Sequence, residues 1–469
     1  MAEKIATREA YGKALAALAE KYPDLVCFDA DLAGATMTKY FKAACPERFF
    51  DMGIAEADMV GVAAGMSLCG FKPFVNTFAM FAAGRAWEQV RNSVAYPHLN
   101  VKVVGSHGGL SVGEDGATHQ CIEDFAIMRA IPGMLVLCPC DGNEMRLAVE
   151  ALVNYEGPAY MRLGRLAVET VTDSIPGYKF ELGKGATLRD GTDVTIIAVG
   201  MNVQMALAAA DKLAAEGVSA RVIDMHTIKP LDTELVLKAA KETGAIVTTE
   251  EANVLGGLGA AVAEYLSENY PVPVVRHGVN DEFGRSGKAP LVLDAYGVNA
   301  DGIVAKVKQA LAMKKWFNTN YHYIVPEVED STQIRLTGNK LWAEYAEAKE
   351  LGIETKPVIT GVYTLFKLCR FTGKKRADDF INAFIEAYKD VYSKCEAVGI
   401  QWLQFDEPAL VQDMTEEDRE LFVKMYSDIL GKKQSCKVLL QTYFGDVRDV
   451  YEDIVKLSFD CLLYTSDAA

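Results

Sequence analysis

The sequence predicts an α/β protein, with two parallel-sheet α/β domains followed by part of a (β/α)8 barrel. Three observations lead to this fold class. Half of the residues are apolar, which is ample for extended cores. Apolar strand-like runs alternate with amphipathic helical segments over residues 180–311, and a similar alternation continues over residues 314–460. Repeated strand and helix units favour parallel sheets, because each parallel strand needs a crossover connection to reach the next.

The clearest elements lie between residues 193 and 251. We expect strands at 193–200, 219–225 and 245–251, which are short apolar runs rich in Val, Ile and Thr. Helices are expected between them at 205–217 and 231–244, and each closes on a glycine. This order predicts a parallel sheet.

Charge and composition exclude several classes of partner. The formal net charge is −16 and the pI is about 5.0, which argues against nucleic acid or an anionic membrane surface. The longest uncharged run, residues 194–210, divides into a strand, a turn and a helix, so we expect no membrane span. Residues 1–10 lack the apolar core of a signal peptide. Ten scattered cysteines favour a reducing, cytoplasmic location.

Residues 51–65, DMGIAEADMVGVAAG, contain a carboxylate among apolar and small residues. Glu56 is poorly solvated there, so we expect it to be neutral or to share a proton with a partner. The alternative is a structural role, because acidic residues often begin helices and a helix through Met59 and Val62 would start here.

Residues 105–120, GSHGGLSVGEDGATHQ, are too rich in glycine for a helix. Two of the six histidines of the chain, His107 and His119, lie in this segment together with Glu114 and Asp115. Loops of this kind usually bind a ligand, and the alternative is that the histidines shape the loop by structural hydrogen bonds.

Together these segments resemble the C-terminal half of transketolase, the half that forms a separate subunit in split transketolases, and the resemblance extends from Met1 to about Leu311. It implies thiamine diphosphate as the cofactor. The Glu of the family pattern, here Glu56, contacts the pyrimidine ring nitrogen. A proton held there favours the imino tautomer of the exocyclic amine, which then takes the proton from the thiazolium carbon.

The same resemblance implies a sugar phosphate as substrate. Arg8, in ATREAYGKAL, and Arg162, in MRLGR, match residues that bind phosphate, for which a guanidinium is well suited. His107, Asp115 and His119 match residues that hydrogen-bond substrate hydroxyls, and the two histidines also count as catalytic residues.

Three more residues are expected to contact the cofactor. Phe78 and Phe81, in PFVNTFAMF, resemble the aromatic residues around the pyrimidine, and Asp31, in DADLAGAT, matches an acidic residue near the thiazolium ring. For Phe78 ordinary core packing is the alternative. Between Phe81 and Arg91 the spacing differs from that of the longer enzymes of the family.

The family signature that holds the diphosphate, GDG followed by Asn at metal-binding spacing, does not occur in the sequence. We therefore expect Mg²⁺ or Ca²⁺ on a partner, the N-terminal-half transketolase subunit, in a dimer of heterodimers, with no turnover by this chain alone. Cys138 and Cys140 lack a second pair for a zinc site, so no metal ligands are expected here. A subunit similar to 1-deoxy-D-xylulose-5-phosphate synthase is the nearest alternative.

The C-terminal domain of that resemblance, with MHTIKPLD and TTEEANVLGGLG, serves mainly dimerisation in the family. His226, Glu250 and Glu251 are therefore expected to be structural. From Lys314 the chain is instead similar to the N-terminal domain of cobalamin-independent methionine synthase, through KKWFNTNYHYIVPEV, KPVITGVYTLFKL, GIQWLQFDEPALV and VLLQTYFGDV.

On this second pattern Lys315 would contact folate, and Asp406 and Glu407 would have a structural or folate-side role. The family's zinc-binding domain is not in the sequence, so this part is expected to be a fragment of the 5-methyltetrahydropteroyltriglutamate–homocysteine methyltransferase family, at most folate-binding. An interaction module in a natural fusion and an artificial join are further alternatives. The expected domains are 1–172, 173–312 and 313–460, with an unrelated tail at 461–469.

Overall fold

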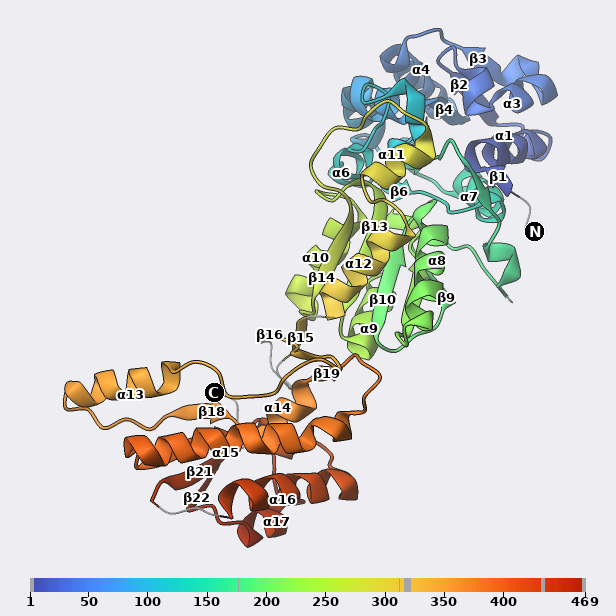
Figure 1. The fold of residues 1–469 in the computed structure, drawn as a ribbon. Helices are drawn as coiled ribbons and strands as arrows, with labels where there is room; N and C mark the ends of the chain where they lie inside the picture. The colour runs from blue at the N-terminus through green and yellow to red at the C-terminus, as the bar shows by residue number, and fades with distance from the viewer. Residues whose placement is uncertain (1–3, 176, 312, 316–321, 432–434, 466–469) are drawn as a thin grey trace. The chain divides into compact units, whose positions relative to one another are not determined.

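The computed structural model describes all residues except 1–3, 176, 312, 316–321, 432–434 and 466–469 (Figure 1). The chain divides into two compact units, Met1–Ala312 and Met313–Ala469. Among the described residues, no helix has both the length and the apolar character needed to cross a membrane.

The N-terminal part of the first unit is built on a seven-stranded sheet. All strands are parallel except the last, which runs antiparallel to its neighbour. In spatial order they are β3 (Phe49–Asp51), β2 (Leu25–Asp29), β4 (Lys72–Phe78), β5 (Lys102–Ser106), β7 (Ala159–Arg162), β6 (Leu135–Leu137) and β12 (Thr227–Lys229).

Helices pack on both faces of this sheet, as expected for parallel strands with buried side chains on both sides. Along β2, Val26 packs in the core that contains Met59 of α4, whereas the next residue, Cys27, packs with Leu15 of α1. Successive strand residues thus serve opposite cores. The helices are α1 (Thr7–Leu18), α2 (Ala33–Thr36), α3 (Lys39–Ala44), α4 (Glu56–Leu68), α5 (Trp87–Gln89), α6 (Asp124–Arg129) and α7 (Gly142–Asn154), with π-helical segments at Phe81–Arg85 and Val90–Ala95.

The second sheet of the first unit has five strands, and all but the last run parallel. In spatial order they are β14 (Val274–Val279), β13 (Ile246–Asn253), β10 (Val194–Ala198), β11 (Ala220–Asp224) and β9 (Ala186–Arg189). The helices of this part are α8 (Asn202–Ala215), α9 (Thr233–Thr243), α10 (Leu258–Asn269), α11 (Ala289–Ala295) and α12 (Ala300–Leu311). The predicted order of strands and helices between residues 193 and 251 is confirmed.

Local signals explain the limits of α9. The Asp232 side chain accepts a hydrogen bond from the Leu235 backbone N–H at 3.1 Å, which caps the N-terminus. Gly244 ends the helix with a left-handed backbone conformation, at a φ of 69°. Both signals are visible in the sequence.

The two sheets of the first unit are joined by more than the chain connection. Strand β12 follows β11 in sequence but pairs with β6 of the first sheet. One apolar core contains residues from both parts, including Val136 and Ile223. The short strands β1 (Lys4–Ala6) and β8 (Ala167–Glu169) form a separate antiparallel pair.

The second unit has an open sheet of four parallel strands, in the order β18 (Val358–Thr360), β20 (Trp402–Asp406), β21 (Lys437–Tyr443) and β22 (Cys461–Thr465). Its helices are α13 (Lys340–Glu350), α14 (Val362–Leu368), α15 (Ile381–Val398), α16 (Glu416–Leu430) and α17 (Tyr451–Lys456). Two-stranded sheets pair β15 (Met313–Lys315) with β16 (His322–Ile324) and β17 (Glu327–Val328) with β19 (Arg370–Phe371). Consecutive strand–helix units with open edges are the arrangement expected of a partial barrel.

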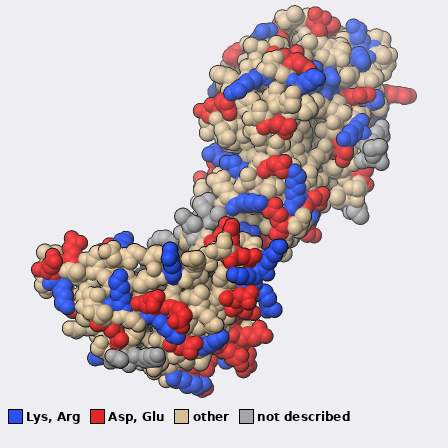
Figure 2. All heavy atoms as spheres, in the orientation of Figure 1, with Lys and Arg blue, Asp and Glu red and all other residues tan. Residues whose placement is uncertain are grey.

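Charged side chains of both signs are interspersed on the visible face of each unit (Figure 2). The negative net charge of the chain is therefore not gathered into one patch on this face.

Candidate functional site

The predicted site residues follow the carboxyl ends of parallel strands of the first sheet. Asp31 comes two residues after β2, Glu56 five residues after β3, and Phe78 is the last residue of β4. His107 directly follows β5, and Arg162 is the last residue of β7. Because these strands run parallel, all five positions lie at one edge of the sheet, where ligands of open α/β sheets bind.

Glu56 is the first residue of α4, and its side chain is only 1% exposed. Its Oε2 lies 3.0 Å from Nη1 of Arg85, which comes from the π-helical segment Phe81–Arg85. The first-turn amide groups and the positive end of the helix dipole also favour a carboxylate at this position. The helix-start interpretation is therefore correct, and it is compatible with a role in binding.

Four rings form a group that Arg85, the partner of this carboxylate, contacts. The Phe78 ring lies 4.2 Å from the His107 ring and stacks on Phe81 at 6.1 Å, measured between centroids. His119 meets the edges of Phe78 and Phe81 at 6.1 and 5.5 Å. The Arg85 guanidinium lies 5.0 Å from the Phe81 centroid and links these rings to Glu56. Six residues from separate segments of the chain thus form one cluster of aromatic, imidazole and charged groups.

His107 is buried and has a left-handed backbone conformation, with a φ of 59°. Its Nδ1 lies 2.7 Å from the Ser106 hydroxyl. Burial lowers the pKa of His107 to about 3, with further contributions from the positive charges of Arg8, Arg165 and His119. A neutral imidazole at physiological pH can both donate and accept a hydrogen bond, so it suits a sugar hydroxyl.

Arg8 lies in the first turn of α1 and donates from Nη1 to the Ala35 carbonyl at 2.7 Å. Its Nε is buried and has no hydrogen-bond partner among the described residues. Burial lowers the pKa of Arg8, and the nearby charge of Arg165 lowers it further. Two guanidinium groups that repel each other beside a neutral histidine are suited to an anion.

Arg165 was missed by the sequence analysis. It lies three residues after Arg162 in the same MRLGR motif, so the signal was present, but the resemblance matched only the first arginine of the motif. Its Nη1 contacts the Val112 carbonyl and lies 3.3 Å from Oε2 of the exposed Glu114.

The structure does not bring Arg162 into this cluster. Its side chain is 4% exposed, with Nε 3.5 Å from Oδ2 of Asp124 and Nη2 donating to the carbonyls of Cys121 and Glu251 at 3.3 and 2.8 Å. Burial lowers the pKa of Arg162, but the carboxylates of Asp124 and Glu251 more than offset this and raise it above the ordinary value. Its predicted contact with phosphate stays a prediction.

The loop that carries Asp115 and His119 is held from the C-terminal part of the unit. Ser111 donates from its backbone N–H to Glu251 Oε1 and from its hydroxyl to Oε2 at 3.2 Å. Gln120 donates to the Arg285 carbonyl at 2.9 Å. Asp115 itself is exposed and His119 is half-buried. Glu251 and Gln120 thus position the loop, a role that local sequence patterns did not indicate.

Asp31 is exposed and has a left-handed conformation, with a φ of 61°. Its backbone N–H donates to Oδ1 of Asp51 at 3.1 Å, which fixes the segment after β2 beside the end of β3. The side chain of Asp31 is thus at the predicted edge of the sheet, while its expected contact with a thiazolium ring stays a prediction.

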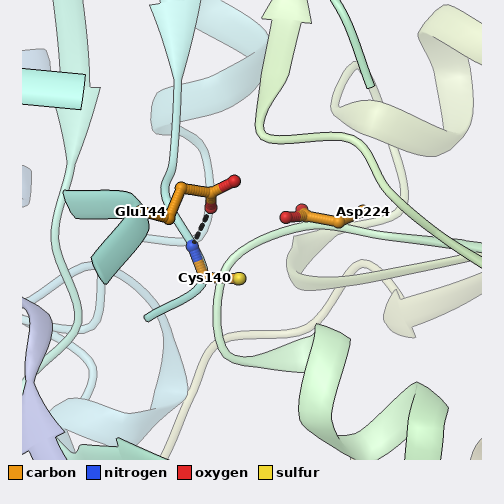
Figure 3. A group of neighbouring side chains, drawn as sticks. All are labelled: Cys140, Glu144 and Asp224. Atoms are coloured by element: carbon orange, nitrogen blue, oxygen red, sulfur yellow. Dashed lines mark hydrogen bonds between the residues drawn. The ribbon is translucent and has the colours of Figure 1, made fainter. Parts of the chain in front are cut away.

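A second polar group lies in the interior of the first unit. The ligand atoms of Cys140, Glu144 and Asp224 all lie within 4.8 Å of one another, and all three residues are buried (Figure 3). Glu144 accepts hydrogen bonds from the Cys140 N–H at 2.6 Å and from the Tyr178 hydroxyl. Burial and the neighbouring Glu144 raise the pKa of Asp224 well above its ordinary value, which favours the protonated carboxyl. Both carboxylate oxygens of Asp224 lack a hydrogen-bond partner among the described residues.

In the second unit, Lys315 lies in β15, but its side chain is outside the described residues. Glu407 is fully buried and accepts hydrogen bonds from the N–H groups of Tyr363 and Thr364 at 3.0 and 2.7 Å, and from the Tyr426 hydroxyl. These contacts tie β20 to α14 and α16, in agreement with a structural role.

Three known domain families match parts of the chain. The pyrimidine binding domain of transketolase matches residues 3–170, and the C-terminal domain of transketolase matches residues 183–303. The N-terminal domain of cobalamin-independent synthase matches residues 278–464 and so overlaps the preceding match.

Individual relatives match the first unit over nearly their whole length. A putative transketolase C-terminal section of Methanocaldococcus jannaschii is 46% identical over 65% of this chain and 96% of its own. A 6-deoxy-6-sulfo-D-fructose transketolase subunit of Clostridium sp. (strain MSTE9) is 44% identical over 66% of this chain and 95% of its own. A solved split-gene transketolase, described as an inactive beta4 tetramer, is 52% identical over 66% of this chain and 98% of its own, with a TM-score of 0.61. The chain therefore belongs to the transketolase family, as the C-terminal half of a split transketolase joined to a fragment of the N-terminal domain of cobalamin-independent methionine synthase.

Proposed function

We propose that the first unit is one subunit of a thiamine diphosphate-dependent transketolase that moves a two-carbon ketol unit between sugar phosphates. The observation that carries this proposal is the buried carboxylate of Glu56, whose partner Arg85 lies over the Phe81 ring, which in turn stacks on Phe78. A flat, nitrogen-containing ring fits such a site, because aromatic faces can stack on it and a carboxyl group can share a proton with a ring nitrogen.

Glu56 would hold a proton at the pyrimidine nitrogen, and Phe78 and Phe81 would orient the ring. When bound, thiamine diphosphate supplies the nucleophilic carbon that carries the two-carbon unit. His107 and His119 would hydrogen-bond the sugar hydroxyls. The neutral state of His107 favours this role, because a neutral imidazole can donate to or accept from a hydroxyl.

The phosphate would be held by Arg8. The N–H of its buried Nε has no acceptor among the described residues, and Arg165 adds a second positive charge nearby. A charge-assisted hydrogen bond to phosphate would relieve the repulsion between the two arginines. Asp115, on the exposed loop, would contact a sugar hydroxyl.

A partner subunit would supply the diphosphate site and its Mg²⁺ or Ca²⁺. The surface of α4 supports this part of the proposal, because Ile54, which precedes α4, and Leu68, its last residue, are each 74% exposed. A Cβ added at Gly61 or Gly65 of α4 would meet nothing within 4 Å. An exposed apolar face of a helix is typical of an interface, and the family expectation is a dimer of heterodimers.

The test is a reconstitution assay. The chain is mixed with an N-terminal-half transketolase subunit, thiamine diphosphate and Mg²⁺, and transfer from a ketose phosphate to an aldose phosphate is measured. We expect activity only in the mixture, and we expect Glu56→Gln to lower kcat by about 100-fold or more, the range of a lost proton transfer.

Glu20→Gln is the control, because Glu20 is an exposed carboxylate just after α1, outside the proposed interface at α4. This variant should retain its activity. Full turnover by the chain alone would refute the partner requirement, and an active Glu56→Gln variant would refute the role of Glu56.

A further inference from the structure

Arg85 is the counter-ion of Glu56. The Glu56 carboxylate is almost completely buried, and a buried charge is strongly destabilising without a partner. Nη1 of Arg85 lies 3.0 Å from Oε2 of Glu56. The Glu56–Arg85 pair therefore satisfies a carboxylate that the start of α4 alone would leave poorly compensated.

The Arg85 side chain also contacts the ring of Phe81, on which the pyrimidine of the cofactor is proposed to stack. Its guanidinium carbon lies 5.0 Å from the Phe81 centroid, a distance that permits a cation–π interaction. Arg85 comes from the π-helical segment that begins at Phe81, so both residues are held by one short piece of backbone. The guanidinium thus contacts both the carboxylate and one of the two phenylalanines of the proposed site.

The proposed function requires the same two groups for another contact. Glu56 must share a proton with a ring nitrogen, whereas a guanidinium stays charged and favours the ionised carboxylate. The ring also needs an aromatic face on which to stack. Arg85 and the pyrimidine therefore compete for the Glu56 carboxylate and for the face of the Phe81 ring.

We propose that Arg85 is a positioning residue that stabilises Glu56 in the cofactor-free subunit and is displaced from it when the pyrimidine of thiamine diphosphate binds. This inference rests on the proposed function. Displacement is feasible because the Arg85 side chain is 53% exposed, so its charge can move into water with little loss of solvation. In this proposal only Arg85 moves, and the Glu56 side chain keeps its position at the first residue of α4.

The first test needs no cofactor and no activity. Thermal unfolding of the full chain is compared for the wild type, Arg85→Met, Glu56→Gln and the double variant. We expect Arg85→Met to lower Tm when Glu56 is present and to have no such effect in the Glu56→Gln background. Equal effects of Arg85→Met on Tm in both backgrounds would contradict a stabilising Glu56–Arg85 interaction. They would show that the variant loses only packing contacts.

The second test measures the dissociation constant of thiamine diphosphate for the enzyme reconstituted with its partner subunit and Mg²⁺, by calorimetry. Removal of a half-exposed competing ion pair should tighten binding about twofold to fivefold in Arg85→Met. Weaker binding would show that Arg85 contacts the cofactor directly, and unchanged binding would show that it does not compete; either result overturns the proposal.

Arg91→Met is the matched control. Arg91 lies on the next π-helical segment, is exposed and donates to Asn92. The same change of charge there should alter neither Tm nor the dissociation constant. If the wild-type complex does not bind thiamine diphosphate at all, the proposed function fails, while the unfolding cycle still reports on the Glu56–Arg85 pair.

Discussion

Glu251 of β13 accepts hydrogen bonds from both the backbone N–H and the hydroxyl of Ser111, across the boundary between the two sheets of the first unit. The loop that carries Asp115 and His119 is therefore held by the C-terminal part of the unit. A domain expected to serve mainly dimerisation also positions the proposed substrate loop.

Glu251→Ala should lower both stability and substrate affinity. The variant leaves buried donors of Ser111 without a partner, which costs about 1–3 kcal/mol in the free energy of unfolding. Urea denaturation measures this loss, and the KM for the sugar phosphate in the reconstituted enzyme should rise. Glu264→Ala is the control, because Glu264 forms a surface ion pair with Arg129 and its loss should have little effect on stability. An unchanged KM in Glu251→Ala would contradict a role of this loop in substrate binding.

The pH dependence of stability should contain a contribution from Asp224. Its pKa is raised in the folded chain, so the folded state keeps a proton that the unfolded state releases above the ordinary value of 3.8. The stability from this group is therefore complete at lower pH and is lost as pH rises from the ordinary value toward the folded value. As pH rises over this range, the wild type should lose free energy of unfolding that Asp224→Asn does not lose. The variant should therefore become more stable relative to the wild type.

Denaturant unfolding at several pH values measures this difference. Asp211→Asn is the control, since Asp211 is an exposed partner of Arg189 on the surface. A difference between the wild type and Asp224→Asn that stays constant with pH would contradict a neutral Asp224 in the fold.

Arg8, Arg165 and Arg162 should respond differently to substitution by Gln. Arg8→Gln should raise the KM for a sugar phosphate by about tenfold, the loss of a charge-assisted hydrogen bond of about 1.5 kcal/mol. Arg165→Gln should raise it less, since Arg165 also contacts Glu114. Arg162→Gln should mainly destabilise the fold, because it leaves the buried carboxylate of Asp124 without its charged partner.

Steady-state kinetics and urea denaturation of the same three proteins separate these effects. A stable Arg162→Gln variant with a strongly raised KM would instead support the direct phosphate contact predicted for Arg162 from the sequence.

Charge on the exposed face beside α4 should prevent assembly. Ile54→Asp and Leu68→Asp place a carboxylate in a surface that the partner subunit is proposed to cover, where burial of an unpaired charge is strongly unfavourable. Sedimentation of the mixed subunits should show free chain in place of the complex. Leu351→Asp, at an equally exposed leucine of the second unit, should leave assembly unchanged. Normal assembly of both α4-side variants would place the interface elsewhere.

Some elements were predictable because their signals are local. The strands β10, β11 and β13 are apolar runs of strand length, and glycine and Asp232 mark helix limits. Strand β12 was not predicted as part of the first sheet, because its pairing with β6 joins residues about 90 positions apart and leaves no local signal. The pattern of alternation therefore predicts the order of elements better than their partners.

The resemblance to transketolase singled out Glu56, Phe78 and His107, and the structure places them at or just after the carboxyl ends of β3, β4 and β5, at one edge of the parallel sheet. Which charged groups meet there depends on packing between distant segments. Arg85 faces Glu56, and Arg162 turns inward to Asp124. A side chain's direction is set by its local backbone, but its surroundings are set by elements folded against it from elsewhere in the chain, and only the folded structure contains that information.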